Sequence, residues 1–140
     1  MKSRNILFVL ALSLGMFATS CSNDDNEGET IVPLAGKYNL SKTGTIVNGN
    51  EVLVDAAENQ EGCTANRDYL DLRVSNAAVI GDYSGENCAL VETTGTYVRS
   101  HNDLTITVGN VSSTSDIMNL TNKELKIKDK TTGIITVYTR

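Results

Sequence analysis

Few residues of this chain carry the chemistry that catalysis needs. His101 is the only histidine, and it lies in the turn-like tripeptide His101-Asn102-Asp103. A nucleophilic triad needs a histidine base beside serine, threonine or cysteine, and a zinc site needs three or four histidine, cysteine or carboxylate ligands. Neither set occurs here at a suitable spacing, and no glycine-rich phosphate loop is present. We therefore expect no enzymatic activity, no metal and no cofactor.

Paired carboxylates are the remaining route to catalysis, since glycosidases need only two. Glu58 and Glu61 lie close in sequence to Asp68 and Asp71. The odd spacing of the two aspartates places them on opposite faces of one strand, and both glutamates lie in an expected loop before Cys63. These side chains are better interpreted as solvated acids on an acidic surface.

The three cysteines offer covalent chemistry of a different kind, and the first of them follows a signal-like segment. Lys2 and Arg4 precede an apolar run over 6–17, and the small residues of 18–20 lead into Cys21. A bilayer-spanning helix needs about 20 apolar residues, so this shorter run is typical of a signal-peptide core. Residues 1–20 are therefore predicted to be a signal peptide.

The segment that ends at Cys21 resembles the signal of bacterial lipoproteins, with Ala18 where that family favours leucine. The resemblance implies cleavage before Cys21 and attachment of fatty acyl chains, such as palmitate, to that residue. Two or more acyl chains hold a protein stably on a membrane. The expected location is therefore a bacterial cell envelope, at the outer membrane. An ordinary secretory signal, in which Cys21 has no role, is the alternative.

Residues 21–32 are predicted to form a flexible tether after the lipidated cysteine. The stretch 22–30 contains four acids, no base and no large apolar side chain, so it cannot bury enough surface to fold. An acidic run in this place also resembles the surface-export signal of Bacteroidetes-type lipoproteins. A plain polar spacer is the alternative.

The charge of the exported chain argues against two classes of partner. Loss of residues 1–20 would remove Lys2 and Arg4 from the 12 bases and leave all 17 acids, so ten bases would remain and the formal charge would be −7. Such a balance argues against binding to nucleic acid and against electrostatic adhesion to anionic lipid. Contact with the membrane is therefore expected through the lipid anchor alone.

Cys63 and Cys88 are the other two cysteines. An even pair in an exported protein predicts a disulfide. Closing a loop of about 25 residues would stabilise the fold by roughly 3–4 kcal/mol in the chain-entropy model. Two free thiols or a metal-binding pair are the alternatives.

Residues 33–140 have the length of one small domain and alternate apolar with polar side chains, which predicts strands with one wet face. Asn48-Gly49-Asn50 indicates a hairpin, 109–115 a polar loop, and 55–60 the best but very short helix candidate. The predicted strands, about eight and up to ten if the last groups are split, are 36–46, 51–54, 68–74, 77–83, 88–93, 95–100, 103–108 with 115–120, and 124–128 with 133–139. Tight turns favour pairing in chain order, and closure removes the bare edges of such a sheet. The expected fold is an all-β, antiparallel up-and-down barrel.

The pattern over 33–140 resembles the small lipocalin-like lipoproteins of Bacteroidetes-type envelopes. Gly36-Lys37-Tyr38 stands where lipocalins begin their first strand with Gly-x-Trp, and the strand sequences around 68–70, 95–97 and 104–106 fit as well. This chain departs from the family in having tyrosine in place of tryptophan and in lacking a C-terminal helix, and both departures argue against a large cavity. An eight-stranded barrel either fills with its own side chains or holds one small ligand.

Two functions are expected from this resemblance for a domain that acts as a monomer. In the first, the barrel binds a small apolar molecule. In the second, the same side chains fill the core and the outer surface binds another envelope protein. The candidate lining of the barrel is Tyr38, Leu40, Leu70, Leu72, Leu104, Ile106, Leu125 and Ile127.

Overall fold

The computed structural model describes residues 32–56, 63 and 66–140, and within these ranges no helix is long and apolar enough to cross a membrane. The predicted signal peptide, Cys21, nearly all of the tether and most of the helix candidate lie outside the described residues. The described residues form nine strands: β1 (Gly36–Val47), β2 (Asn50–Asp55), β3 (Tyr69–Leu72), β4 (Ala77–Ser84), β5 (Ala89–Ser100), β6 (Asp103–Val108), β7 (Val111–Leu120), β8 (Glu124–Asp129) and β9 (Ile135–Thr139).

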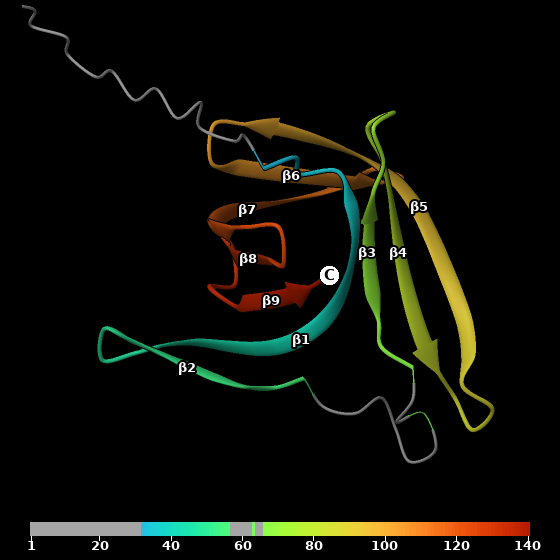
Figure 1. Cartoon of the computed structure of the whole chain (residues 1–140), viewed down its shortest axis with the longest axis horizontal. Helices are drawn as coiled ribbons and strands as arrows, with labels where there is room; N and C mark the ends of the chain where they lie inside the picture. Colours follow the sequence, from blue (N-terminus) through green and yellow to red (C-terminus); the bar gives the residue numbers. More distant parts are fainter. Residues whose placement is uncertain (1–31, 57–62, 64–65) are drawn as a thin grey trace, which may run out of the picture. The chain divides into compact units, whose positions relative to one another are not determined.

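Eight of these strands close into an antiparallel barrel. From β3 to β9 each strand pairs with the next along the chain, and β1 closes the ring by pairing with both β3 and β9. In Figure 1, β3, β4 and β5 run across the direction of β6 to β9, and β1 bends from one set to the other. The predicted all-β, up-and-down barrel is confirmed.

β2 is an additional strand outside the ring. It pairs with residues 42–47 of β1, whereas residues 36–39 of β1 pair with β3. The two strands are joined by Asn48 and Gly49, which both have positive φ angles (52° and 82°). Two such residues form the tight turn that suits the twist of a hairpin, so the hairpin predicted at this position is confirmed.

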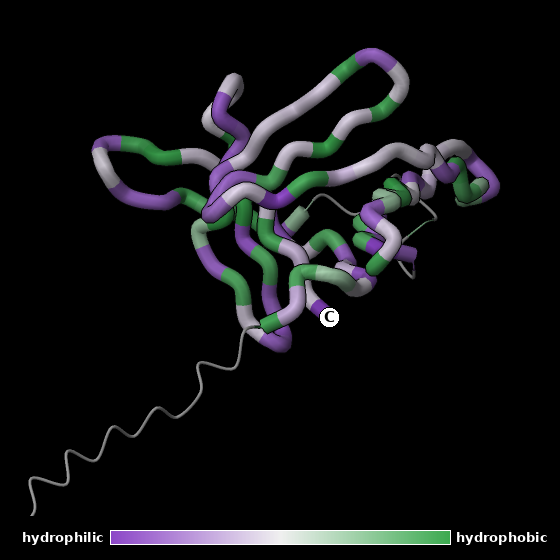
Figure 2. Tube along the Cα trace, turned by 90° about the horizontal axis from the view of Figure 1, so that it is seen from above, coloured by the Kyte–Doolittle hydropathy of each residue, from purple (hydrophilic) through white to green (hydrophobic). Residues whose placement is uncertain are grey.

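The connections divide the barrel into two ends. At one end, named here the closed end, lie residues 33–35, Arg140 and the turns 73–76, 101–102 and 121–123. At the other, named the open end, lie the turns 85–88, 109–110 and 130–134. Figure 2 shows hydrophobic and hydrophilic positions interspersed along the tube. Apolar residues occupy every second position of β3, β6 and β8, on the inner face, as a barrel with a dry inside and a wet outside requires.

The closed end is sealed around Tyr38, whose side chain is fully buried. Its hydroxyl donates a hydrogen bond to the carbonyl oxygen of Leu34 at 2.8 Å. The guanidinium of Arg140 lies 4.4 Å from the centre of the Tyr38 ring and donates hydrogen bonds to that hydroxyl and to the carbonyl oxygens of Pro33 and Ala35. Both ends of the domain's chain are thereby fastened to one buried ring.

The interior next to this seal is packed with large side chains. They come from β1, β3, β4, β5, β6 and β8, so that residues far apart in sequence meet in one cluster. The cluster of buried residues comprises Leu34, Tyr38, Leu70, Leu72, Ala78, Tyr97, Leu104, Leu125 and Ile127. The hydroxyl of Tyr97 donates a hydrogen bond to the carbonyl oxygen of Arg73 at 2.9 Å, which ties the turn after β3 to this core.

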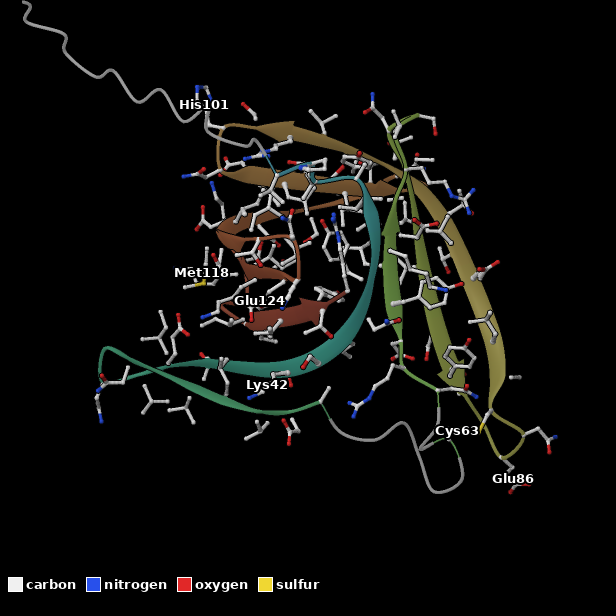
Figure 3. All side chains as sticks on the ribbon, in the orientation of Figure 1. Lys42, Cys63, Glu86, His101, Met118 and Glu124 are labelled. Atoms are coloured by element: carbon white, nitrogen blue, oxygen red, sulfur yellow. A yellow bond between two sulfur atoms is a disulfide. The ribbon has the colours of Figure 1, made fainter. Side chains whose placement is uncertain are left out.

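A disulfide joins Cys63 to Cys88, as predicted. The bond connects the segment before β3 to the turn between β4 and β5, so it lies at the open end. Figure 3 shows Cys63 beside this turn, which also carries Glu86. Covalent closure of the loop between the cysteines therefore fixes the β4–β5 hairpin where the core packing is thinner.

The predicted loop over 109–115 is wrong, because β7 begins at Val111 and only Gly109 and Asn110 form the turn. The polar residues of this stretch pair across strands. The hydroxyls of Thr105 and Thr114 lie 2.9 Å apart, and those of Thr107 and Ser112 lie 2.8 Å apart. Cross-strand hydroxyl pairs stabilise a solvated sheet face, so a run of serine and threonine is strand here.

Two further strand boundaries differ from the prediction. The segments 88–93 and 95–100 form the single strand β5. The predicted strand 68–74 ends at Leu72, and Val74 lies in the following turn with 90% of its surface exposed. Asn76 closes this turn with a φ of 64°, a conformation that asparagine tolerates better than most residues.

Candidate functional site

The barrel contains an apolar cavity at its open end. The cavity has a volume of about 270 Å³ and opens to solvent. The side chains that line it come from five strands, β4, β6, β7, β8 and β9, and are Ile80, Leu104, Ile106, Val108, Val111, Ser113, Ile127 and Tyr138. Leu104 and Ile127 also belong to the buried core cluster, so the cavity borders that core.

Strand alternation and register direct these side chains inward. Leu104, Ile106 and Val108 occupy every second position of β6 and therefore share one face. Opposite them, Ile106 pairs with Ser113 of β7 and Val108 pairs with Val111. Residues paired across antiparallel strands lie on the same face, so both strands present their cavity residues together.

The wall of the barrel next to the cavity carries small side chains. On β5, Thr93 pairs with Ile80 and Gly95 pairs with Ala78. In addition, β5 pairs with β6 only over residues 96–100, so the half of β5 nearest the open end has no ladder to β6. Tyr38 and Tyr97 fill the closed end, whereas the ring of Tyr138 forms part of the wall of the open-end hollow and leaves it unfilled.

The mouth of the cavity exposes apolar surface to water. Val111 is 73% exposed and Ile80 is 37% exposed, although both line the cavity. Scattered apolar residues on a surface are ordinary, but apolar residues grouped at the rim of a hollow are typical of a binding site.

Two polar side chains accompany the apolar lining. The hydroxyl of Ser113 donates a hydrogen bond to the carboxylate of Asp129 at 2.7 Å. Burial raises the pKa of Tyr138 to about 12, so its phenol stays neutral at physiological pH. A neutral phenol in an apolar wall can orient a ligand through a single hydrogen bond.

The barrel fold agrees with what this sequence is similar to. The sequence model of the lipocalin-like domain family matches residues 34–127 of the chain, which is well over half of its length. The chain belongs to the lipocalin-like domain family. Among proteins with curated descriptions, none is similar enough in sequence to match.

Solved structures share the fold of this lipocalin-like domain. A lipocalin-like protein from Bacteroides uniformis ATCC 8492 aligns with a TM-score of 0.56 at 13% identity, covering 76% of this chain and 97% of that one. An uncharacterized protein from Bacteroides eggerthii DSM 20697 aligns with a TM-score of 0.55 at 12% identity, covering 77% of this chain and 99% of that one. At such low identity the likeness concerns the fold.

The candidate lining residues of the lipocalin-like barrel divide between its two ends. Tyr38, Leu70, Leu72 and Leu125 belong to the packed core and are at most 2% exposed. Leu104, Ile106 and Ile127 form part of the cavity wall. Leu40 lies beside an irregularity of β1 and lines a separate pocket on the outside of the barrel.

Five residues of the cavity were not among the candidates: Ile80, Val108, Val111, Ser113 and Tyr138. Val108 continues the alternation of Leu104 and Ile106, so the sequence contained a signal for it. Val111 and Ser113 fell in the stretch interpreted as a loop. Tyr138 pairs with Leu125 and follows it into the interior, a placement that only the register of β8 and β9 determines.

His101 lies far from the interior of the lipocalin-like barrel, in the turn between β5 and β6. Its side chain is exposed, and Figure 3 shows it at the edge of the molecule. Within the described residues, no group of three or more histidine, cysteine or carboxylate side chains could hold a metal ion.

Proposed function

We propose that this domain binds one small apolar molecule in the cavity at its open end, and that it acts by binding and not by catalysis. The observation that carries the proposal is the cavity of about 270 Å³, lined mainly by aliphatic side chains and open to solvent. Ligand sites usually measure roughly 300–1,000 Å³, so the ligand should be small. Membership of the lipocalin-like family supports the same function.

The lining also limits the chemistry of the ligand. No charged side chain lines the cavity, and an ion buried there without a partner would be strongly disfavoured. Transfer of apolar surface from water contributes about 25 cal/mol per Å². A compact hydrocarbon with at most one neutral polar group, placed near Tyr138, fits this wall.

A neutral fluorescent dye, N-phenyl-1-naphthylamine, tests the cavity directly in a titration of the purified protein. Val108→Phe would place a ring in the hollow, and Val98→Phe is its control because Val98 is 64% exposed on the outside of β5. We expect saturable binding to the wild type and to Val98→Phe, and at least a tenfold weaker signal for Val108→Phe. Absence of saturation in the wild type would contradict the proposal and favour the alternative of a protein partner in the envelope.

We further propose that the protein is a monomer anchored to the bacterial outer membrane through lipid on Cys21. The support is the signal-like segment of residues 1–20 and the acidic tether that follows it. A membrane surface is also where small apolar molecules concentrate. Metabolic labelling with an alkyne analogue of palmitate should mark the wild-type chain and should not mark Cys21→Ser, and equal labelling of both would contradict the anchor.

A further inference from the structure

A second pocket lies on the outer wall of the barrel, close to where β1, β3 and β4 meet the end of β9. It has a volume of about 480 Å³ and is open to solvent. Its lining is Lys37, Asn39, Leu40, Ser41, Asn66, Arg67, Tyr69, Tyr83 and Thr139. None of these residues lines the apolar cavity, so the two hollows are separate sites.

The charge of this outer pocket is opposite to that of the chain. Lys37 and Arg67 line it and no carboxylate does, although the whole chain has a formal charge of −5. Among the ion pairs formed by described residues, neither Lys37 nor Arg67 takes part. The two cations therefore line an open hollow on a protein whose net charge is negative.

The acids nearest in the sheet are engaged with other groups. Asp71, opposite Lys37 in the β1–β3 ladder, pairs with Arg73 at 3.1 Å. The carboxylate of Asp68 accepts a hydrogen bond from the backbone N–H of Tyr83 at 2.8 Å. Both carboxylates are thus already engaged, Asp71 with Arg73 outside the lining and Asp68 with the backbone of the lining residue Tyr83.

Lys37 is held in position by a stacked arrangement. The ring of Tyr69 lies directly on Gly81, where an added Cβ would come within 2.2 Å of the ring. The ammonium nitrogen of Lys37 lies 3.6 Å from the centre of the same ring. The ring is fixed in turn by a hydrogen bond from its hydroxyl to Glu92. Since the lysine is already placed, ligand binding would cost less side-chain entropy.

The rest of the pocket offers neutral polar groups and an aromatic ring. Asn39 and Asn66 supply amides that donate and accept hydrogen bonds, and Ser41 and Thr139 supply hydroxyls. Tyr83 is half-buried and packs edge-on against Tyr69, with ring centres 6.4 Å apart. Such a wall matches a ligand that carries many hydroxyls as well as apolar C–H surface.

From this combination we infer that the outer pocket binds an acidic saccharide, whose carboxylate contacts Arg67 and Lys37 and whose ring lies against Tyr83 and the asparagine amides. The planar guanidinium of Arg67 can donate two parallel hydrogen bonds to a carboxylate. Inorganic phosphate could use the two cations as well, but it would leave the amides, the hydroxyls and the aromatic ring without a role. The neutral lining therefore favours the sugar acid.

Calorimetric titration of the purified protein with galacturonate and glucuronate trisaccharides tests the inference. Arg67→Gln removes one exposed cation of the pocket, and Lys123→Gln is the matched control because it removes one exposed cation from the turn between β7 and β8. A charge-assisted hydrogen bond contributes about 1.5–3 kcal/mol, which corresponds to a loss of affinity of roughly 10- to 100-fold. We expect this loss for Arg67→Gln and unchanged affinity for Lys123→Gln.

Two further ligands, one neutral and one inorganic, show whether binding depends on both the carboxylate and the sugar ring. A neutral galactose trisaccharide should bind far more weakly than the galacturonate trisaccharide, and millimolar inorganic phosphate should not displace the latter. Absence of saturable binding of both acidic trisaccharides, equal binding of the neutral one, or displacement by phosphate at equal affinity would each overturn the inference. Val108→Phe, which fills the apolar cavity, should leave this binding unchanged, so the two proposals can fail independently.

Discussion

The two ends of the barrel are formed by the same sheet, but the interior of one end is packed and the interior of the other contains a cavity. At the closed end, a fully buried tyrosine is covered by Arg140 and the segment 33–35, and the interior is solid. At the open end, the inner face of β5 carries Thr93 and Gly95, and a hollow of about 270 Å³ remains. The two ends differ in their side chains and also in their backbone pairing, because the half of β5 nearest the open end has no ladder to β6.

This contrast shows how a small domain can keep a cavity and still fold. An unfilled volume lowers stability because the surrounding atoms lose packing contacts. Here the loss is offset by dense packing around Tyr38 and by the disulfide between Cys63 and Cys88. If stability is concentrated at the closed end, truncation of an interior side chain there should cost far more than truncation of a cavity-lining side chain at the open end.

Truncation of the central ring should give the largest effect. Tyr38→Ala removes a side chain with no exposed surface and also the partner of Arg140. Aromatic-to-alanine changes in a core cost about 3–5 kcal/mol, and we expect a loss of that size in urea denaturation. Val111→Ala at the open end, where the side chain is 73% exposed, should change stability by less than about 0.5 kcal/mol. Similar losses for both variants would show that the ends are equally important for folding.

Removal of the disulfide should have the next largest effect, and its consequences should be concentrated at the open end. The double variant Cys63→Ser/Cys88→Ser opens a loop with a sequence separation of 25, which corresponds to roughly 3–4 kcal/mol in the chain-entropy model. Hydrogen exchange should accelerate most in the β4–β5 hairpin, which the bond fixes, and less in β1 around Tyr38. Uniform acceleration along the chain would contradict this localisation.

Much of the fold could be predicted from the sequence because alternation is a local property. The alternation of Leu104, Ile106 and Val108 predicts that they share one face of a strand, and Asn48-Gly49 predicts a turn. The boundaries that were wrong depended on contacts across strands. The polar stretch 111–115 becomes strand because Thr105 and Thr107 lie opposite its hydroxyls, and no local pattern contains that information.

The cavity was harder to predict from the sequence than the fold was, for a physical reason. Alternation indicates which side chains point inward, but it does not indicate whether they meet. Leu72 and Ile106 have the same pattern in sequence, yet Leu72 lies in the solid core and Ile106 lies at the cavity. What separates them is the size of the residues across the barrel, and that depends on the register of pairing and on the tilt of the strands.

The smallest predicted effect concerns pH and again separates the two ends. At the open end, Asp129 in the final turn accepts hydrogen bonds from Ser113, Thr132 and Thr131, which lower its pKa to about 2 from 3.8. Because the folded pKa is depressed, this contribution is present above pH 3.8 and is lost as the pH falls toward 2. At the closed end, burial raises the pKa of Tyr38, so its contribution is lost only as the pH rises above about 10.

Acid should therefore weaken the open end and alkali the closed end. The melting temperature of Asp129→Asn should lie a few degrees below that of the wild type at pH 7, and the gap should narrow between pH 4 and pH 2 as the wild type loses its advantage. Glu86→Gln, which removes an exposed carboxylate from another open-end turn, is the matched control and should show no such narrowing. If the difference in melting temperature between the wild type and Asp129→Asn did not change with pH, the charge of the Asp129 carboxylate would not contribute to stability. Any acid sensitivity of the open end would then have another origin.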